Sequence, residues 1–313
     1  MRILVSGGAG FIGSHVVDAY VAAGHEVFVV DDLSTGKREN LNPQTYFLQA
    51  DIQEPVVREL IVEEKIEVVN HHAAQMDVRR SVADPLFDAR VNILGLLNVL
   101  EGAREAKVKK VIFASSGGTV YGEQERFPAD ETHPTHPICP YGVSKRTGEH
   151  YLYFYHVEYG IPYIALRYAN IYGPRQDPHG EAGVVAIFAL RFLSGEQPMV
   201  NGDGKQTRDY VFVGDVARAN LAALQVEYTG PLNIGTGGET DVNQLFRMLR
   251  ELAGSSVPEV HGLAKPGEQR RSVLAWDRAA QILNWQPEVT LEDGLRQTVA
   301  YFRTRNDRHH PHS

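Results

Sequence analysis

Residues 6–13 read S-G-G-A-G-F-I-G, between an apolar run at 3–5 and a helical pattern that begins at residue 12. The stretch satisfies G-x-x-G-x-x-G with Gly7, Gly10 and Gly13, and also G-x-G-x-x-G from Gly8. Glycines at these positions permit a tight turn and let backbone N–H groups and a helix N-terminus approach a pyrophosphate. A strand before the glycines and a helix after them therefore predict a dinucleotide-binding βαβ unit.

A carboxylate closes the next apolar run. Asp31 ends the run at 27–31, about 20 residues beyond the glycines, as a dinucleotide site requires. A carboxylate there accepts hydrogen bonds from the adenosine ribose hydroxyls and repels a 2′-phosphate, which favours NAD over NADP. Lys37 and Arg38 are the counter-argument, because cations just beyond the strand can pair with a 2′-phosphate.

Short β-branched runs alternate with helical patterns through the first half of the chain. We expect strands at 3–6, 27–31, 68–71 and 111–115 and helices at 12–23 and 88–106. This alternation predicts a parallel sheet with helices on both faces, a Rossmann-type doubly wound α/β fold. After about residue 168, stretches rich in Gly and Pro separate shorter elements. We expect a Rossmann domain over 1–167, rejoined by about 208–236, and a smaller α/β substrate-binding lobe from 168–207 and 237–313.

The composition excludes several classes of protein. A chain of 313 residues with a formal net charge of −8 is not expected to bind nucleic acid. No apolar run reaches the ~18 residues of a membrane span, and the first residues pass directly into a strand pattern, which leaves no room for a signal peptide. One cysteine, Cys139, excludes an intrachain disulfide and a zinc site with several cysteines. We expect a cytoplasmic protein without a metal site.

A tyrosine and a lysine stand four residues apart in C-P-Y-G-V-S-K, residues 139–145. Pro140 is typical of a helix start, so Tyr141 and Lys145 lie on one helical face. A tyrosine with a pKa of about 10 is a poor base near neutrality. The lysine, the helix N-terminus and a nicotinamide cation would all favour the tyrosinate. The spacing alone is a weak signal, but S-S-G-G-T-V-Y-G at 115–122 predicts a loop that can face this pair.

These motifs resemble those of the extended short-chain dehydrogenase/reductases, and within them the UDP-glucose 4-epimerases. The resemblance runs through G-G-A-G-F-I-G-S-H, V-V-D-D-L-S-T-G, P-Y-G-V-S-K, L-R-Y-A-N-I-Y-G-P-R and R-D-Y-V-F-V-G-D-V, over nearly the whole length. It implies that NAD is the cofactor, that a UDP-sugar is the substrate, and that Tyr141 is the acid/base with Lys145 as the partner that lowers its pKa. At the cofactor the resemblance places Gly7, Gly10, Phe11, Ile12, Gly13, Asp31, Asp32, Leu33, Ser34, Thr35, Gly36, Asp51, Ile52, Ala73, Ala74, Gln75, Asn92, Ser115, Tyr141, Lys145 and Tyr168. At the substrate it places Asn170, Arg208, Lys265 and Ser272.

One hydroxyl of the family pattern is missing. Gly117 stands where relatives carry the catalytic Ser or Thr that bridges the sugar O4 and the tyrosine. If the strand alternation continues, Ser115, Gly117 and Thr119 share one face and Ser116 points away. We therefore expect Thr119, rather than Ser116, to supply the hydroxyl. The alternative is that both hydroxyls only satisfy local backbone groups.

The substrate also remains open between several sugars. Ser272 stands where epimerases confined to glucose and galactose carry a tyrosine, so a small residue predicts room for N-acetylated sugars as well. Residues 79–80, R-R, keep open a UDP-glucuronate 4-epimerase or decarboxylase, which needs a cation for the carboxylate. A 4,6-dehydratase would carry Asp-Glu where Gly118 and Thr119 stand.

Two further expectations concern assembly and class. The non-enzymatic alternative is a scaffold that binds NAD without catalysis. Such a protein would have no reason to keep the tyrosine, the lysine and the cations of the substrate lobe together. The long helical patterns at 88–106 and 143–158 predict a homodimer built on a four-helix interface.

Overall fold

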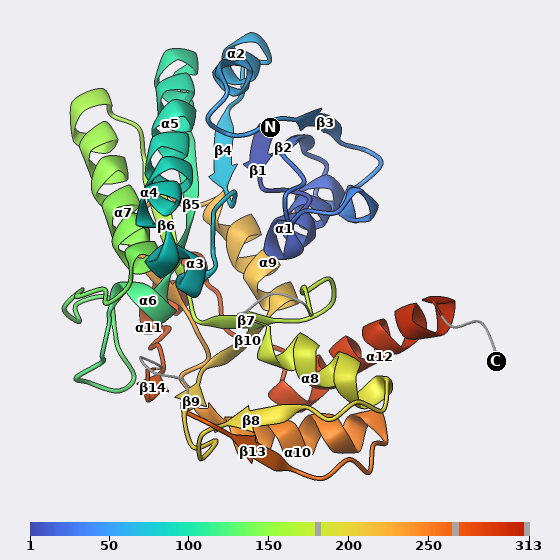
Figure 1. Ribbon diagram of the computed structural model, residues 1–313. Coiled ribbons are helices and arrows are strands. Elements are labelled where there is room, and N and C mark those ends of the chain that lie inside the picture. The colour runs from blue at the N-terminus through green and yellow to red at the C-terminus, as the bar shows by residue number, and fades with distance from the viewer. Residues whose placement is uncertain (179–182, 265–268, 310–313) are drawn as a thin grey trace.

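The computed structural model describes residues 1–178, 183–264 and 269–309, with side chains described to residue 305. A seven-stranded parallel sheet forms its centre, with strands in the order β11-β6-β5-β4-β1-β2-β3 (Figure 1). The strands are β1 Arg2–Ser6, β2 Glu26–Asp31, β3 Tyr46–Gln49, β4 Val68–His71, β5 Lys110–Ser116, β6 Tyr163–Tyr168 and β11 Gly230–Ile234. The predicted Rossmann-type doubly wound sheet is confirmed.

Helices cover both faces of this sheet, which is why its strands are almost continuously apolar. On one face lie α1 Phe11–Ala22, α9 Val213–Ala223 and α11 Asp277–Leu283, in one apolar core with the strands. On the other lie α2 Pro55–Glu63, α5 Gly95–Ala106 and α7 Pro140–Tyr159. The strand order reverses between β1 and β4, and in folds of this kind ligands bind at the carboxyl ends of the strands at that point.

The predicted helix at 88–106 is confirmed, although it begins at Pro85 and contains a π-helical turn. The chain forms α3 Val78–Ala83, α4 Pro85–Ala89, a π-helical turn at Arg90–Leu94 and then α5. The wider turn directs Asn92 inward, where its Nδ2 donates to the Gln75 carbonyl at 2.8 Å and its Oδ1 accepts from the Gln75 N–H at 2.9 Å. A regular helical period cannot show this break, because the partner lies on another loop.

Most of the remaining described elements build a second lobe (Figure 1). They are β7 Asn170–Tyr172, α8 Val184–Leu193, β8 Met199–Asn201, β9 Thr207–Arg208, β10 Tyr210–Phe212, β12 Thr240–Asp241, α10 Val242–Ala253, β13 Val260–Gly262, β14 Arg271–Ser272 and α12 Leu291–His309. The strands pair as β10-β7, β12-β9-β14 and β13-β8, and α8, α10 and α12 share one apolar core. Strand β11 returns to the main sheet beside β6, while the expected domain boundaries stay a prediction.

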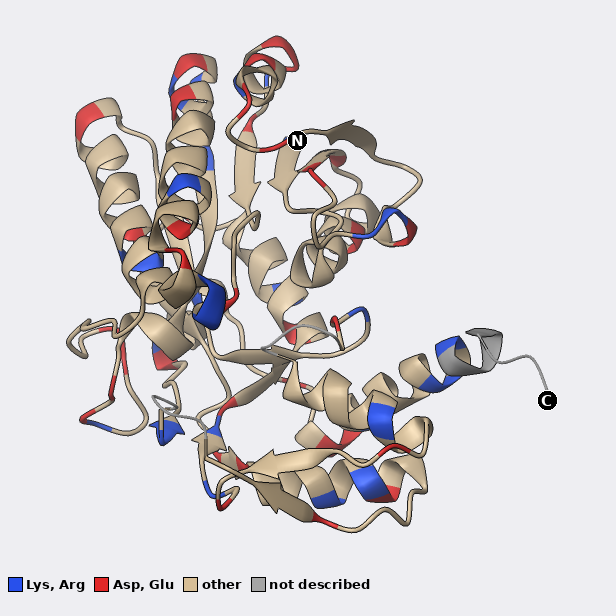
Figure 2. Ribbon diagram, in the orientation of Figure 1, with Lys and Arg blue, Asp and Glu red and all other residues tan. Residues whose placement is uncertain are grey.

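Charged side chains of both signs are mixed over the two lobes (Figure 2). In the part of the chain that the structure describes, no helix is both long and apolar enough to cross a bilayer. Within the same residues, no group of three His, Cys, Asp or Glu side chains is arranged to hold a metal ion.

Candidate active site

The glycine-rich loop joins β1 to α1 at the carboxyl edge of the sheet. Gly7 has φ +72°, and a Cβ on it would lie 2.6 Å from the backbone nitrogen of Ala73, which follows β4. Only glycine allows this approach at that backbone conformation. Gly10 precedes α1 in extended conformation, and Phe11, Ile12 and Gly13 form the first turn of the helix. The predicted phosphate loop and the predicted groove residue Ala73 therefore lie together, with the N-terminus of α1 directed at the space between them.

Asp31 fixes the other side of this loop. Its carboxylate accepts hydrogen bonds from the Ala9 N–H at 3.0 Å and from the Leu33 N–H at 2.8 Å. Burial raises the pKa of Asp31, and these two N–H donors oppose that effect. The following turn contains Asp32, Ser34, Thr35 and Gly36, with the Ser34 hydroxyl donating to Asp32 at 2.6 Å. Each carboxylate oxygen keeps a second lone pair, so Asp31 can also accept from a ribose.

Of Lys37 and Arg38, the two cations that could bind the 2′-phosphate of NADP, Arg38 contacts other side chains of the protein. Arg38 donates to Gln49, and its guanidinium lies 5.6 Å from the centre of the Phe47 ring, both on β3. Asp51 and Ile52 follow that strand, where Asp51 accepts from the Gln53 N–H at 2.9 Å and Ile52 is buried. The residues expected around the adenosine thus lie along the carboxyl ends of β2 and β3.

A buried carboxylate that the sequence reasoning missed joins the loop after β4 to α7. Asp88 is fully buried, and its Oδ1 accepts from Asn92 Nδ2 and Gln75 Nε2, each at 3.0 Å. Its Oδ2 accepts from the Ser144 hydroxyl on α7 at 2.6 Å. Asp88 therefore ties the loop of Ala74 and Gln75 to the helix that carries the Y-x-x-x-K pair. A buried aspartate at this position of a helical pattern gives no signal of its own in the sequence.

Helix α7 begins at Pro140 as predicted, so Tyr141 and Lys145 share one face. The Lys145 ammonium lies 5.7 Å from the centre of the Tyr141 ring and donates to the Ala114 carbonyl on β5 at 2.9 Å. Burial lowers the pKa of Lys145 to about 8, while Asp88 acts in the opposite direction. A lysine with this pKa is still largely an ammonium at neutral pH.

The expected lowering of the Tyr141 pKa by the chain's own groups is not observed. Burial raises the pKa of the Tyr141 phenol, and Asp88 and Cys139 add to the rise. The nearby Ser116 hydroxyl opposes this rise in the pKa of Tyr141. A tyrosine in this environment needs a further positive charge beside it to act as a base near neutrality.

The strand-parity argument for Thr119 is wrong. Strand β5 ends at Ser116, and residues Gly117–Val120 form the short helix α6, so the alternation on which the argument depended stops one residue too early. Ser116, not Thr119, is the hydroxyl that acts on the pKa of Tyr141. Thr119 packs over the first turn of α7 beside Gly142, and its buried Oγ1 has no hydrogen-bond partner among the described residues.

Two predicted cofactor contacts have other polar partners. The Ser115 hydroxyl donates to Glu149 at 2.6 Å, deep under α7. The Tyr168 hydroxyl lies 3.2 Å from His72 Nε2 and accepts from Asn220 Nδ2 at 2.8 Å. Tyr168 ends β6 beside the groove, whereas the side chain of Ser115 is directed away from it.

The predicted substrate residues come from the neighbouring lobe. The Asn170 side chain and the Ser116 hydroxyl are each 3.9 Å from the place of a Cβ on Gly118, so the lobe's amide lies next to the catalytic cluster. Arg208 and Ser272 are register partners in the pairing of β9 with β14, and Ser272 is buried. Lys265 lies outside the described residues.

Asp209 supports these elements and was also missed. Its buried carboxylate accepts from the Thr236 N–H at 2.9 Å, the Thr236 hydroxyl at 2.6 Å and the Leu274 N–H at 3.2 Å. Burial raises the pKa of Asp209 to about 6 against these donors. The position next to Arg208 in R-D-Y was the available signal. Asp209 holds the turn after β11 and the chain after β14 around the strand of Arg208.

Comparisons with known proteins agree with this arrangement. Residues 3–235 match the model of the NAD dependent epimerase/dehydratase family. The UDP-glucose 4-epimerase of Mycolicibacterium smegmatis is 45% identical over 313 residues, which cover 98% of this chain and 100% of that protein. The structure of the Thermotoga maritima UDP-glucose 4-epimerase with UDP-glucose is 49% identical, with a TM-score of 0.96 over 98% of this chain and 100% of that one. The Thermus thermophilus UDP-glucose 4-epimerase in complex with NAD is 46% identical, with a TM-score of 0.92 over 97% and 99% of the two chains.

Proposed function

Because the chain belongs to the NAD-dependent epimerase/dehydratase family, we propose that it is a UDP-glucose 4-epimerase that interconverts UDP-glucose and UDP-galactose with bound NAD. The observation that carries the proposal is the cluster of Ser116, Tyr141 and Lys145 at the carboxyl end of the sheet. This cluster lies between the dinucleotide groove and the lobe that contributes Asn170. A hydroxyl, a phenol and an ammonium close to one another are the groups needed to move the proton of a sugar alcohol.

The groove fits NAD. The backbone of Gly7 packs directly against that of Ala73, so the loop lies close to the chain after β4, and Asp31 lies where it can accept from ribose hydroxyls. When bound, NAD supplies the hydride acceptor and a positive charge beside Tyr141. The Lys145 ammonium would add to that charge and could donate to a ribose hydroxyl of the cofactor. We propose that Gly7, Asp31 and Lys145 belong to the cofactor site. The other residues predicted for the cofactor that follow the carboxyl ends of β1, β2, β3 and β4 complete it.

Tyr141 is the proposed general base. It takes the proton from the sugar O4 as the C4 hydrogen leaves with its electron pair, which gives a 4-keto sugar. Ser116 lies between the phenol and the sugar O4 in this proposal. Its hydroxyl hydrogen-bonds both groups and so takes the role of the hydroxyl that Gly117 lacks. Return of the hydride to the opposite face, with the proton returned by Tyr141, inverts C4 with no net redox change. The sugar must rotate between these two steps. The protein must therefore hold the substrate mainly through its nucleotide and make only weak contacts with the hexose.

Arg208 and Asn170 are the proposed anchors for the UDP moiety, because a guanidinium pairs well with phosphate oxygens. The small Ser272 beside Arg208 supports acceptance of UDP-N-acetylhexosamines as well. The glucuronate alternative has less support. The arginine pair at 79–80 is exposed on α3, the blue turn near the centre of Figure 2, and Arg80 stacks at 3.9 Å over the Phe87 ring.

A homodimer in the cytoplasm is also part of the proposal. Val143, Phe154 and Val157 on α7 are each about half exposed or more, at 48%, 47% and 64%. Leu86 on α4 and Leu94 in the π-helical turn are 70% and 55% exposed, and both elements pack against α7. Apolar side chains gathered on adjacent helices are typical of a helix–helix interface between subunits. With one cysteine, the chain needs no oxidising compartment.

Product analysis without added cofactor tests the function. The purified protein is incubated separately with UDP-galactose, UDP-N-acetylgalactosamine, UDP-glucuronate and dTDP-glucose, and the products are identified by NMR. We expect UDP-galactose to give UDP-glucose, and the denatured protein to release NAD. Turnover of UDP-glucuronate alone would favour the acidic-sugar alternative. Release of NADP would contradict the cofactor assignment, and no turnover of any sugar would support a scaffold.

A further inference from the structure

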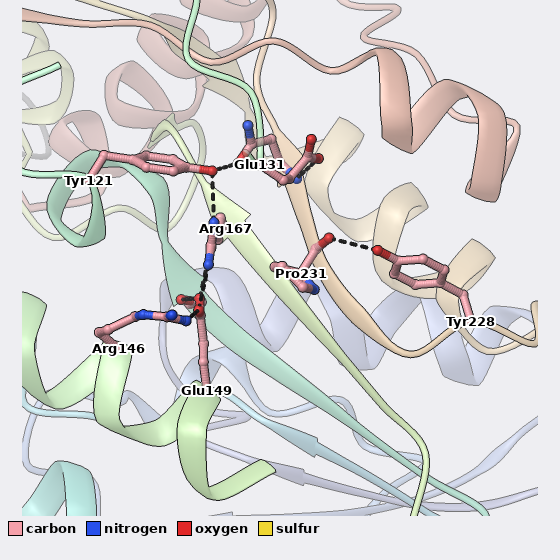
Figure 3. Close-up of polar contacts among 9 residues, drawn as sticks. Tyr121, Glu131, Arg146, Glu149, Arg167, Tyr228 and Pro231 are labelled. Carbon is pink, nitrogen blue, oxygen red and sulfur yellow. Dashed lines mark hydrogen bonds and ion pairs between the residues drawn. The ribbon is translucent and has the colours of Figure 1, made fainter. Parts of the chain in front are cut away.

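Strand β6 carries one charged side chain in an otherwise apolar run. Arg167 is 2% exposed, and its guanidinium donates to Glu149 on α7 through two bonds, Nε to Oε1 at 2.9 Å and NH2 to Oε2 at 2.6 Å. Its third contact is to the hydroxyl of Tyr121, which accepts from NH1 at 2.9 Å (Figure 3). Burial alone would raise the pKa of Glu149, but Arg167, the Ser115 hydroxyl and Arg146 together lower it, so the pair stays ionised.

Such a pair is a poor means of stabilising a fold. Taking both charges out of water costs several kcal/mol, and the attraction between them roughly offsets that cost. An apolar pair of similar volume would stabilise the core as well or better. What the ion pair adds is direction, because a two-point contact fixes both the distance and the orientation of α7 relative to β6.

The contacts of this pair reach each element of the catalytic cluster. Glu149 lies one helical turn beyond Lys145 on α7, and its Oε1 also accepts from the Ser115 hydroxyl at 2.6 Å. Ser115 directly precedes Ser116, whose hydroxyl lies beside Gly118 and acts on the pKa of Tyr141. Tyr121 follows the last residue of α6, the helix of Thr119. Four segments are thus held through one buried ion pair.

The same network extends to the neighbouring lobe. The Tyr121 hydroxyl donates to Asn233 Oδ1 on β11 at 2.7 Å, and Asn233 Nδ2 donates to the Ala129 carbonyl at 3.0 Å. Ala129 in turn bonds the backbone of Val273, directly after Ser272. The Asn233 N–H donates to Glu131 at 2.8 Å, which lies beside these residues in Figure 3. The network therefore relates the catalytic cluster to the strand proposed to line the sugar site.

We propose that Glu149, Arg167 and Tyr121 are positioning residues that hold Ser116 against Tyr141 for proton transfer, while none of the three contacts the sugar itself. This inference rests on the proposed function. If the network only stabilised the fold, its loss would lower stability without a specific effect on the chemical step. If it positions the cluster, its loss lowers kcat while the nucleotide still binds, because the anchors of the nucleotide lie on other elements.

Tyr121→Phe tests this with the loss of one oxygen. The matched control is Tyr20→Phe, since Tyr20 is also fully buried and its hydroxyl contacts Asn70 and the Asn220 carbonyl. We expect Tyr121→Phe to lower kcat for UDP-galactose by roughly 10- to 100-fold, the effect of a small misplacement of reacting groups, with KM changed less than about twofold. Tyr20→Phe should leave kcat within about twofold at a similar loss of thermal stability. The acid limb of the kcat–pH profile should move upward in Tyr121→Phe alone, because a displaced Ser116 would no longer oppose the rise that burial causes in the pKa of Tyr141.

Glu149→Gln removes the charge with little change in shape and should show the same split between kcat and KM. The double variant Glu149→Leu/Arg167→Met replaces the ion pair by apolar side chains, so it keeps the test open if Glu149→Gln does not fold. Unchanged kcat in a folded Tyr121→Phe, or equal losses in Tyr121→Phe and Tyr20→Phe, would overturn the inference. An inactive wild type would instead refute the proposed function, so the two failures are distinguishable.

Discussion

Gly117→Ser would restore the hydroxyl that the family pattern carries, and the structure predicts that it is not tolerated on its own. Gly117 does not have a positive φ, so the backbone does not require glycine there. The obstacle is Leu274, which follows β14 and is fully buried. A Cβ on Gly117 would lie 2.4 Å from Leu274 Cδ1 and 3.1 Å from Cδ2. Leu274 thus occupies the volume that a side chain at 117 needs.

The magnitude follows from this overlap. Forcing an extra group into a packed core costs about 1–3 kcal/mol, and we expect that loss for Gly117→Ser. Leu274→Ala alone should cost about 2–5 kcal/mol, because it leaves a cavity beside Val120 and Tyr121. In the double variant the serine fills part of that cavity. Its loss should therefore be smaller than the sum of the single losses by about 1–2 kcal/mol, within the range for residues in contact.

Urea denaturation of the four proteins of this cycle gives the free energies of unfolding. Gly118→Ser is the control, because the nearest atoms to a Cβ at 118 are 3.9 Å away and leave room for it. Additivity of the two changes within about 0.5 kcal/mol would refute the reasoning, since it would mean that Leu274 and a side chain at 117 do not compete for space. A fully stable Gly117→Ser would refute it too.

Three further outcomes follow from the site. Ser116→Ala should lower kcat more than Thr119→Val, since Ser116 is the hydroxyl that meets Tyr141, and steady-state rates of the two variants show the order; the reverse order would return the role to Thr119. Tyr141→Phe should lower kcat by ~10²–10⁴-fold with KM nearly unchanged, and near-normal turnover would exclude it as the base. Burial lowers the pKa of Lys145 from 10.5 to about 8. The buried ammonium therefore lowers the free energy of unfolding by its full amount below pH 8, where the lysine is charged in both the folded and the unfolded state, and has no effect above about pH 10.5, where it is neutral in both. Lys145→Met in the cofactor-free protein should therefore raise the free energy of unfolding by up to ~3 kcal/mol at pH 7 and by much less at pH 10, as measured by urea denaturation; an equal gain at both pH values would contradict this.

The sequence was sufficient where a local pattern carries the physics. The phosphate loop, Asp31 and the helix start at Pro140 each follow from a few neighbouring residues, and the structure places them as predicted. Apolar runs likewise predicted the parallel sheet, because strands covered on both faces need apolar side chains on both.

The misses depend on contacts between distant segments. The π-helical turn inside the predicted helix places Asn92 in hydrogen bonds with the backbone of Gln75, a distant contact that no helical period reveals. The end of β5 at Ser116 inverted the assignment of the hydroxyl, since strand ends are poorly determined by a local pattern. Glu149 and Asp88 read as ordinary polar residues of helices until their partners on other elements are known.

Isotope retention tests the central claim most directly. UDP-galactose carrying deuterium at C4 is converted by the purified protein in ordinary water, and the deuterium content at C4 of the product is measured by NMR and mass spectrometry. An epimerase that removes hydride and returns the same hydride to the other face keeps the label, so we predict UDP-glucose with deuterium fully retained at C4. Loss of the label to solvent, or a 4-keto sugar that accumulates as the final product, would contradict the account.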